Sequence, residues 1–328
     1  MALPAVTKTY QYNVNNTIAA GGSILESCQK TLLALKNALV GFATLPWTVV
    51  GSCNSVASGM DAVDRWSVYT DLIWHTGVNA KSWIVLKNTG IAANWQICFH
   101  LITNAPTAAY YMEMVVSPSS GFTGGSTTAR PTAADEIIIK ASPNINWMGT
   151  LSVAVTTITH VMKSTDGKVT RWFVANAGKI VSYFSVEEAA DPVTGWTAPV
   201  IVTTPPYSSL VIDHPTYANL YSLSTALNGY HSGVKFGCYA TAEGFVNDAN
   251  GEQLNVTANE FSNEWMMGPV GIASTQAGYR GRHGRFYDLW WGTTLHENGT
   301  TFPADTSRQF ALLGDLIVPW NGTIPVVS

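Results

Sequence analysis

The sequence predicts a mainly β protein: an antiparallel β-sandwich-like fold with one N-terminal amphipathic helix, at about residues 23–41, packed on a sheet. Two observations support this. From Pro46 onward, short runs rich in Val, Ile, Phe, Tyr and Trp alternate with turns rich in Gly, Ser, Thr, Asn and Pro. These runs do not alternate regularly with helical segments, so a parallel βαβ sheet is not expected.

One segment has the periodicity of an amphipathic helix. In SILESCQKTLLALKNALVGF, apolar residues recur near helical spacing while Lys30 and Lys36 fall elsewhere. Ser23 followed by Glu26 has the S-x-x-E form of a capping box, and Gly41 is a suitable stop. A helix of about 18 residues extends about 27 Å, which is enough to cover one face of a sheet.

Strands are expected along most of the chain. An alternating segment at 7–17 precedes the helix, and a second, short helix is a candidate at 215–227. The remaining expected strands are 47–52, 82–88, 95–103, 110–117, 135–141, 151–163, 169–176, 179–188, 209–214, 233–241, 285–292 and 311–320.

The chain has 328 residues, a length that permits two domains but also suits one large β-rich unit. No repeat of fixed period is present, and we expect a single β-rich structural unit over residues 1–328. The Gly/Ser/Thr-rich segment 118–134 is the best candidate for a subdivision, and it suits an exposed interaction loop equally well.

The composition favours polar but uncharged surfaces. Charged residues make up only 12% of the chain, which is about half the usual share. Such surfaces suit contact with other protein, although an extracellular-type β protein fits the composition equally well. The net charge is −4, and the densest basic patch is the short run from Arg280 to Arg285. That patch is too small for a phosphate-binding face, so no nucleic-acid partner is expected.

The cysteines and the N-terminus indicate neither a metal site nor a membrane span. Cys28, Cys53, Cys98 and Cys238 form no CxxC pair and have no histidine at zinc-ligand spacing. They have the character of small buried hydrophobes. A single disulfide between two of them is an alternative that the sequence leaves undecided. The first residues have neither the charged start nor the apolar core of a signal peptide, and no stretch of about 18 apolar residues occurs. We expect a chain made in a cytoplasm, with no membrane partner.

Searches for catalytic motifs favour a protein that is not an enzyme and that has no cofactor. The motifs GxSxG, HExxH, GxGxxG and the P-loop are absent. Ser27-x-x-Lys30 matches SxxK only by chance on the helix. The segment 247–252 looks like a calcium loop, but placing Gly251 at position 6 puts Val246 at position 1, where an EF-hand needs a carboxylate. A carboxylate pair for glycoside hydrolysis stays open. Its candidates are Glu113, Asp135 and Glu136.

Six residues are candidates for a protein interface. The adjacent Trp290 and Trp291 point to opposite faces of a strand, so one is expected in the core while the other is exposed or covers a neighbour. The full candidate set is Trp290, Trp291, Trp320, Arg280, Arg282 and Arg285. Because aromatic faces also stack on sugar rings, a weak glycan contact stays open.

The stretch HVMKSTDGKVTRWFVANAGKIVSYFSVEEA (160–189) holds several polar groups that suit either catalysis or the wet face of a sheet. Asp166-Gly167 predicts a hairpin turn. Alternation places Arg171 and Trp172 on opposite faces of the strand that follows. Both faces carry large apolar groups, so we expect protein to cover both sides, and we interpret the stretch as a scaffold hairpin.

Three stretches together resemble uncharacterised virion structural proteins of tailed bacteriophages. They are KSTDGKVTRWFVANAGKIVSYFSVEEA, SWIVLKN followed by WQICFHL, and the final segment from RFYDLWWGTTLHENGTT to its end. The likeness also includes TYQYNVNNTI, the helix and TLPWTVVGS, and so spans nearly the whole chain. It implies a capsid decoration, collar, tail or fibre-base protein of the virion, with no catalytic or binding residues to transfer.

The resemblance implies a homo-oligomeric, non-enzymatic subunit whose partners are copies of itself and other phage virion proteins. The N-terminal segment and the tail 319–328 are candidates for contacts between subunits, because chain ends are usually loose unless something holds them. The alternatives are a carbohydrate- or receptor-binding module, a polysaccharide-acting tail protein and a secreted β protein.

Overall fold

The computed structural model describes part of the chain in two compact units. The described ranges are 6–19, 21–72, 82–88, 90–91, 96–104, 109–117, 120–140, 156–176, 181–190, 197–203, 208–211, 221–222, 237–242, 266–275, 279–293, 301–302, 310–313 and 316–320. The helix unit is built from Tyr10–Ser182, and the C-terminal unit from Tyr183–Val326 together with Met1–Thr9. The described part of 118–134 lies inside the helix unit. That the two units act as one structural subunit stays a prediction.

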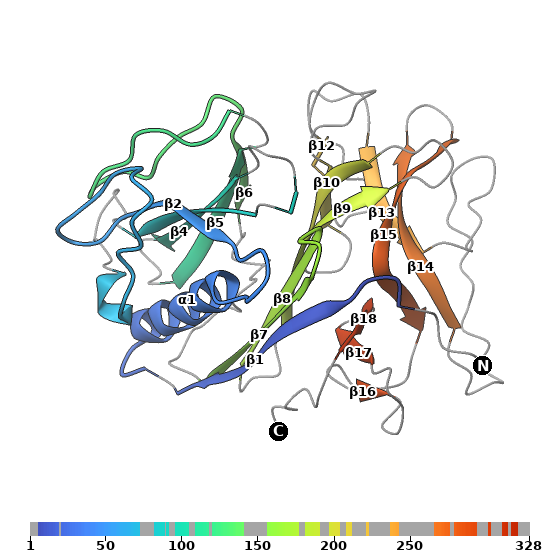
Figure 1. Ribbon diagram of the computed structural model, residues 1–328, viewed down its shortest axis with the longest axis horizontal. Coiled ribbons are helices and arrows are strands. Elements are labelled where there is room, and N and C mark those ends of the chain that lie inside the picture. The colour runs from blue at the N-terminus through green and yellow to red at the C-terminus, as the bar shows by residue number, and fades with distance from the viewer. Residues whose placement is uncertain are drawn as a thin grey trace. The chain divides into compact units, whose positions relative to one another are not determined.

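The fold class is confirmed, because the described chain is mostly antiparallel strand with a single α-helix (Figure 1). The helix unit contains a five-stranded sheet and a group of three paired strands. The sheet has the order β2 (Thr48–Ser52), β3 (Trp83–Lys87), β4 (Gln96–Asn104), β5 (Ala109–Ser117) and β6 (Ile137–Lys140). The group is β1 (Tyr10–Ile18), β7 (Thr157–Ser164) and β8 (Val169–Asn176).

Helix α1 (Ile24–Val40) begins and ends where the sequence predicts. The hydroxyl oxygen of Ser23 accepts the backbone N–H of Glu26 at 3.1 Å, which satisfies one of the free donors of the first turn. The Glu26 carboxylate accepts the N–H of Gly22 at 2.7 Å, one residue before the position that a capping box uses. At the other end, Gly41 N–H donates to Asn37 O at 2.9 Å.

The apolar stripe of α1 packs against β1 and β7. The side chains of Cys28, Leu32, Leu35 and Leu39 are fully buried there. Two polar contacts fix the position of the helix on these strands. The hydroxyls of Thr31 and Thr157 are 2.6 Å apart, and Asn13 Nδ2 donates to Ala38 O at 2.6 Å.

Trp172 of β8 is the centre of the core between the two groups of strands. Its ring meets the rings of Trp47 and Phe99 edge-on, with centroids 6.3 and 6.2 Å away. Such T-shaped pairs add about 0.5–1.5 kcal/mol each beyond the apolar area they bury. The indole N–H of Trp47 donates to Thr170 Oγ1 at 3.1 Å, so this large residue is buried without losing its hydrogen bond.

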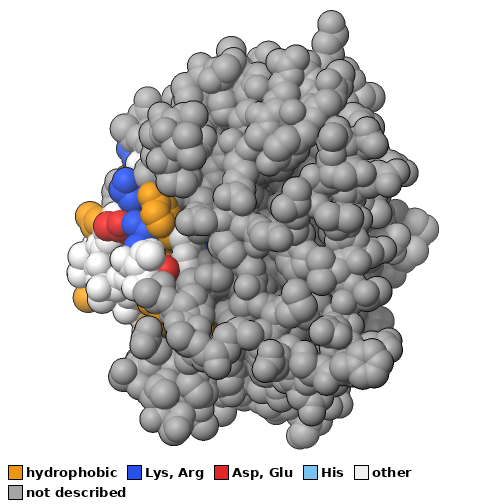
Figure 2. All heavy atoms as spheres, turned by 90° about the vertical axis from the view of Figure 1, so that its right-hand side faces the viewer, with side chains coloured by type: hydrophobic (Ala, Val, Ile, Leu, Met, Phe, Trp, Pro, Cys, Tyr) orange, Lys and Arg blue, Asp and Glu red, His pale blue; other side chains and the backbone are white. Residues whose placement is uncertain are grey.

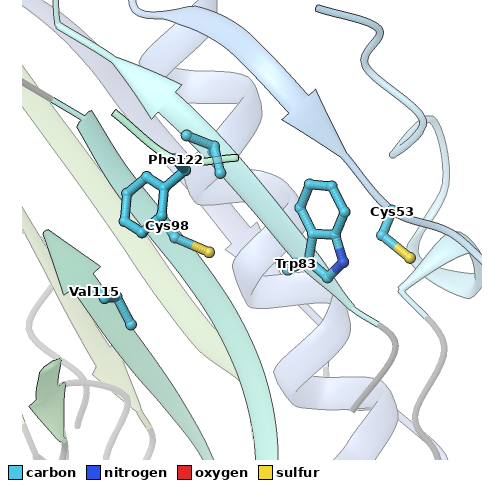
Figure 3. Packing of buried hydrophobic residues seen from close by; sticks show 6 residues of the cluster. Cys53, Trp83, Cys98, Val115 and Phe122 are labelled. Carbon is cyan, nitrogen blue, oxygen red and sulfur yellow. The ribbon is translucent and has the colours of Figure 1, made fainter. Parts of the chain in front are cut away.

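The opposite face of the five-stranded sheet is covered by a loop. Trp83, Val85, Cys98 and Val115 share that face, since they are partners or diagonal neighbours across β3, β4 and β5. Phe122 packs onto them in one buried cluster that also includes Cys53 (Figure 3). The 118–134 segment is therefore a packed cover over its described residues, from 120 onward.

The C-terminal unit consists of antiparallel strands. One series pairs β9 (Val181–Ala190), β10 (Thr197–Thr203), β11 (Ser208–Val211) and β12 (Tyr221–Ser222). A second series pairs β13 (Gly237–Ala242), β14 (Met266–Thr275), β15 (Tyr279–Thr293), β18 (Leu316–Pro319), β17 (Phe310–Leu313) and β16 (Thr301–Phe302). The two series meet at the pair Arg285–Ala190.

The strand predictions differ from the structure in several places. Sequence reasoning missed β10 and β14, and it placed one strand over 311–320 where the structure has β17 and β18. The helix expected at 215–227 is wrong at its described residues, because 221–222 form a strand. Strand β14 holds three small or rigid residues, Gly268, Pro269 and Gly271, which normally mark turns. Among the described residues, no helix is long and apolar enough to cross a membrane.

A glycine substitution tests the close approach between the β7–β8 turn and the loop after β3. Gly167 and Gly124 have nearly the same left-handed backbone, with φ of +74° and +75°. A Cβ at Gly167 would lie 2.7 Å from Gly90 Cα, whereas a Cβ at Gly124 meets nothing within 4 Å. We expect Gly124→Ala to lower the free energy of unfolding by about 1–2 kcal/mol and Gly167→Ala by roughly 2–4 kcal/mol, as measured by urea unfolding. Equal losses in the two variants would show that the approach to Gly90 is not tight.

Candidate functional site

The β7–β8 hairpin buries the basic groups that the sequence marks as candidates for chemistry. His160, Lys163 and Arg171 are at most 1% exposed. The neighbouring Val169, Thr170 and Trp172 are equally buried, which confirms that both faces of β8 are covered at these positions. These basic groups therefore do not lie on a solvent-exposed face of the sheet.

The hairpin turn is held by side chains that a catalyst would need free. Ser164 Oγ donates to the Asp166 carboxylate at 2.6 Å and accepts the N–H of Val169 at 3.0 Å. The same carboxylate accepts the N–H of Lys168 at 3.1 Å, and Gly167 N–H closes the turn onto Ser164 O at 2.9 Å. Asp166 and Ser164 thus stabilise the turn itself.

His160 and Lys163 lie on opposite faces of β7, and burial affects both. Burial lowers the pKa of His160 to about 4, so the imidazole is neutral at pH 7. Burial also lowers the pKa of Lys163, and the nearby Asp166 carboxylate opposes that effect. The Lys163 ammonium donates to Ser164 O at 3.2 Å and lies 5.3 Å from the centroid of the Phe42 ring.

Asp135 and Glu136, two of the candidates for a carboxylate pair, stabilise a loop. Asp135 accepts the hydroxyls of Ser117, at 2.7 Å, and Ser120, and it also accepts the N–H of Ser120 at 3.0 Å. Glu136 binds the guanidinium of Arg130 through two hydrogen bonds of 2.9 and 3.0 Å. This guanidinium lowers the pKa of Glu136 below its ordinary value, so both carboxyls are committed to the fold.

The other motif candidates have structural roles or lie outside the described residues. Ser27 Oγ accepts the N–H of Gly21 at 2.9 Å, and Lys30 pairs with Glu26 at 2.8 Å, so the SxxK match belongs to the helix start. The calcium-like segment 247–252 lies outside the described residues, as does the side chain of Glu113. Within the described part, no group of three or more His, Cys, Asp or Glu residues could hold a metal ion. Cys28, Cys53 and Cys98 are buried thiols and not members of a disulfide.

The structure brings five of the six interface candidates together on one strand. Arg280, Arg282, Arg285, Trp290 and Trp291 all lie on β15. At the two tryptophans, β15 pairs with β14 on one side and with β18 on the other, so the backbone there is interior to the sheet. The side chains of the two tryptophans and of the three arginines lie outside the description, and their interface role stays a prediction.

Trp320 follows directly after β18 and is separate from the β15 set in sequence. Its side chain is only 3% exposed, beside the buried Val318. The isolated chain therefore encloses this indole, and its interface role stays a prediction. Trp47, Trp66, Trp83 and Trp172 are also buried, so these rings present no open face for a sugar.

Sequence reasoning missed one anchoring residue, Asp288 of β15. Its side chain is 4% exposed, and its backbone has a positive φ of 45°. The carboxylate accepts three hydrogen bonds from the N-terminal segment: Thr7 N–H at 2.7 Å, Thr7 Oγ1 at 2.9 Å and Lys8 N–H at 3.0 Å. The ammonium of Lys8 also lies 4.0 Å from the centroid of the Tyr287 ring. The only signal in the sequence is a lone acidic residue inside the aromatic run RFYDLWW.

The N-terminal segment is thus held within its own chain over its described residues. The carboxylate of Asp288 satisfies two backbone donors that would otherwise have no strand partner. The sequence proposed this segment for contacts between subunits, and at Thr7 and Lys8 the contacts shown are internal to the C-terminal unit.

Comparison with known proteins found no match: no family model, no curated protein and no solved structure is similar to this chain.

Acid titration tests the burial of His160. Its pKa of about 4 lies below the ordinary 6.5, so the unfolded chain takes up the proton first and stability falls as the pH drops below about 6.5. Between pH 7 and pH 5 this costs about 2 kcal/mol. We expect His160→Gln to lose that much less stability than the native chain over this interval, as measured by urea unfolding at both pH values. Parallel pH profiles for the two chains would contradict the assignment.

Substitution of Asp288 tests the N-terminal anchor. Asn tolerates the left-handed backbone but loses the charge and one acceptor oxygen. We expect Asp288→Asn to lower the free energy of unfolding by about 1–3 kcal/mol and to speed amide hydrogen exchange at Thr7 and Lys8. The control, Lys8→Met, removes the ammonium that lies over Tyr287 and leaves the backbone donors to Asp288 in place, and it should cost below about 1 kcal/mol. Unchanged exchange at Thr7 in Asp288→Asn would show that another group holds the segment.

Proposed function

We propose that this chain is a non-enzymatic structural subunit of a tailed-phage virion, which assembles with copies of itself and with other virion proteins. On this proposal it is made in the host cytoplasm and resides in the particle. The resemblance of three sequence stretches to such proteins suggests the class. The observation that supports an assembly role is a rigid loop surface on the helix unit, one part of which exposes only small or hydroxyl-bearing residues.

Two segments form this surface, which we call the loop layer: residues 53–72 and 120–136. Side chains fix the backbone of both. Asn54 Oδ1 accepts the N–H groups of Val56 and Ala57 at 3.0 and 2.8 Å, and Asp71 accepts those of Ser67 and Val68 at 2.8 and 3.0 Å. A loop braced in this way loses little conformational entropy when a partner docks.

The second segment is joined to the sheet beneath it. Trp83 Nε1 donates to Ser126 O at 2.9 Å, Phe122 N–H donates to Gln96 Oε1 at 3.0 Å, and Thr123 pairs with Thr132. These contacts tie the loop to β3 and β4, so a rigid sheet positions its outer face. Its conformation is therefore part of the fold.

The exposed residues of 120–136 are uncharged, and its charged residues, Arg130, Asp135 and Glu136, are only partly exposed. Its exposed residues are all small or hydroxyl-bearing: Ser120, Thr123, Gly124, Thr128, Ala129, Thr132 and Ala134. On the first segment of the loop layer, Val56 is 84% exposed, and the exposed carboxylates of Asp61 and Asp64 are paired with Arg65 and Lys36. Depletion of charge at the centre and packing of uncharged groups are typical of protein interfaces. A surface of this kind favours a protein partner over a phosphate-bearing one.

Charged groups of the helix unit are used within it. The ammonium of Lys36 is buried and donates to Asp64 at 2.6 Å and to Trp66 O at 2.7 Å, which ties α1 to the loop layer. Arg65 pairs with Asp61 and donates to Ser52 O at 2.8 Å. On the face drawn in Figure 2, the described side chains show basic, acidic and hydrophobic groups close together and no area of a single charge. The low charge content thus agrees with a subunit that meets other protein.

Charges placed on the loop layer test the proposal. Aspartates at two exposed positions, in Val56→Asp and Thr128→Asp combined, should leave the fold intact because neither side chain is buried. We expect them to reduce self-assembly and incorporation into particles at least about tenfold, because a desolvated, unpaired charge at an interface costs several kcal/mol. Sedimentation velocity measures self-assembly, and electron microscopy with quantitative mass spectrometry of purified particles measures incorporation.

Asn37→Asp is the matched control, since it adds an acidic group at an exposed position of α1. It should assemble normally. Absence of the native chain from purified particles would overturn the virion proposal. Its presence there, with full assembly of the double variant, would place the interface elsewhere.

A further inference from the structure

Two buried donors come from paired positions of β1 and β7 in the helix unit. Gln11 of β1 and Lys163 of β7 are directly opposite partners in the strand ladder, so their side chains leave the same face. Both reach the segment that follows α1. Gln11 Oε1 accepts Thr44 N–H at 3.3 Å, and the Lys163 ammonium lies 5.3 Å from the centroid of the Phe42 ring.

Both side chains have hydrogen-bonding capacity that the described chain leaves unused. Gln11 Nε2 is buried and has no hydrogen-bond partner among the described residues. Its amide orientation is fixed, because turning it would take the oxygen away from Thr44 N–H. Lys163 is fully buried, and of its three N–H groups one meets Ser164 O. No ion pair joins Lys163 to a carboxylate within the described ranges.

The carbonyl oxygens at the end of α1 are already engaged by other donors. Asn37 O accepts Gly41 N–H at 2.9 Å, Ala38 O accepts Asn13 Nδ2 at 2.6 Å, and Leu39 O accepts Trp47 N–H at 3.1 Å. On the other side, Thr170 Oγ1 accepts the indole N–H of Trp47 at 3.1 Å. The surroundings thus supply donors and one positive charge, but few free acceptors.

We propose that Gln11 Nε2 and Lys163 Nζ together bind a small monovalent anion of chloride or bromide size. The Asp166 carboxylate offsets the cost of burying the ammonium only in part, because it is exposed and already accepts Ser164 Oγ and Lys168 N–H. A halide supplies the remaining counter-charge and accepts from both donors. The full burial of Lys163 favours a single-atom anion over a larger oxyanion or a partner's carboxylate. A bound anion also opposes the lowering of the Lys163 pKa by burial.

Thermal unfolding at fixed ionic strength tests the site, with chloride or bromide replacing methanesulfonate, an anion too large to be enclosed. For the native chain we expect the unfolding midpoint to rise along a saturable curve, by roughly 3–6 °C at about ten times Kd. Lys163→Met should lose this response. Lys168→Met removes one lysine from the same hairpin but not from the site, and it should keep the response. An equal halide response in the native chain and Lys163→Met, or no response in the native chain, would overturn the proposal.

A near-isosteric variant keeps the test informative if Lys163→Met fails to fold. Gln11→Glu retains an oxygen for Thr44 N–H and places a carboxylate where the anion would bind, next to Lys163. We expect it to melt higher than the native chain in methanesulfonate and to show no halide response. A retained halide response would refute the site. In crystals grown in bromide, an anomalous peak between Gln11 Nε2 and Lys163 Nζ would support it, and an ordered water at that position would refute it.

Discussion

The helix unit depends on the burial of Trp172 between two groups of strands. Its ring contacts Trp47, which directly precedes β2, and Phe99 of β4. A single residue of β8 therefore packs against two other parts of the unit. Burial of Trp47 without an acceptor for its indole N–H would carry a desolvation cost, and Thr170 of β8 provides that acceptor. The β7–β8 hairpin therefore contributes both the apolar contact and the hydrogen bond that make the contact possible.

This constraint explains why polar and charged groups of the hairpin are internal. A strand covered on both faces has no wet side for a long basic residue, so Lys163 and Arg171 are enclosed with their charges. The Lys163 ammonium meets a carbonyl and an aromatic face, and the ring of Tyr10 lies 6.0 Å from the Arg171 guanidinium. The electrostatic effect of such a buried charge falls mainly on the groups that contact it.

The same use of polar side chains recurs in the loop layer and at the N-terminus. Lys36 ties α1 to a loop, Arg130 and Glu136 close another, and Asp288 holds the segment that leads into β1. Each residue fixes backbone that forms no regular ladder, because a loop needs side chains to satisfy its donors and acceptors. With these groups committed to the interior, the outer face of 120–136 consists of small uncharged residues. The proposed role as an assembly subunit rests on this arrangement, in which charged residues fix the loops and uncharged residues are exposed.

The sequence by itself determined the fold class, the helix from Ser23 to Gly41, the turn at Asp166-Gly167 and most strands of the helix unit. These follow from local periodicity and from the backbone preferences of capping and turn residues, which act over a few positions. It failed at β14, where Gly and Pro imitate a turn, and it could not assign Asp288, whose partners are 280 and 281 positions away. Only the tertiary structure decided that 120–136 covers a sheet and that Gln11 stands beside Lys163. Strand pairing and packing between distant segments fix those neighbours, and no local pattern records them.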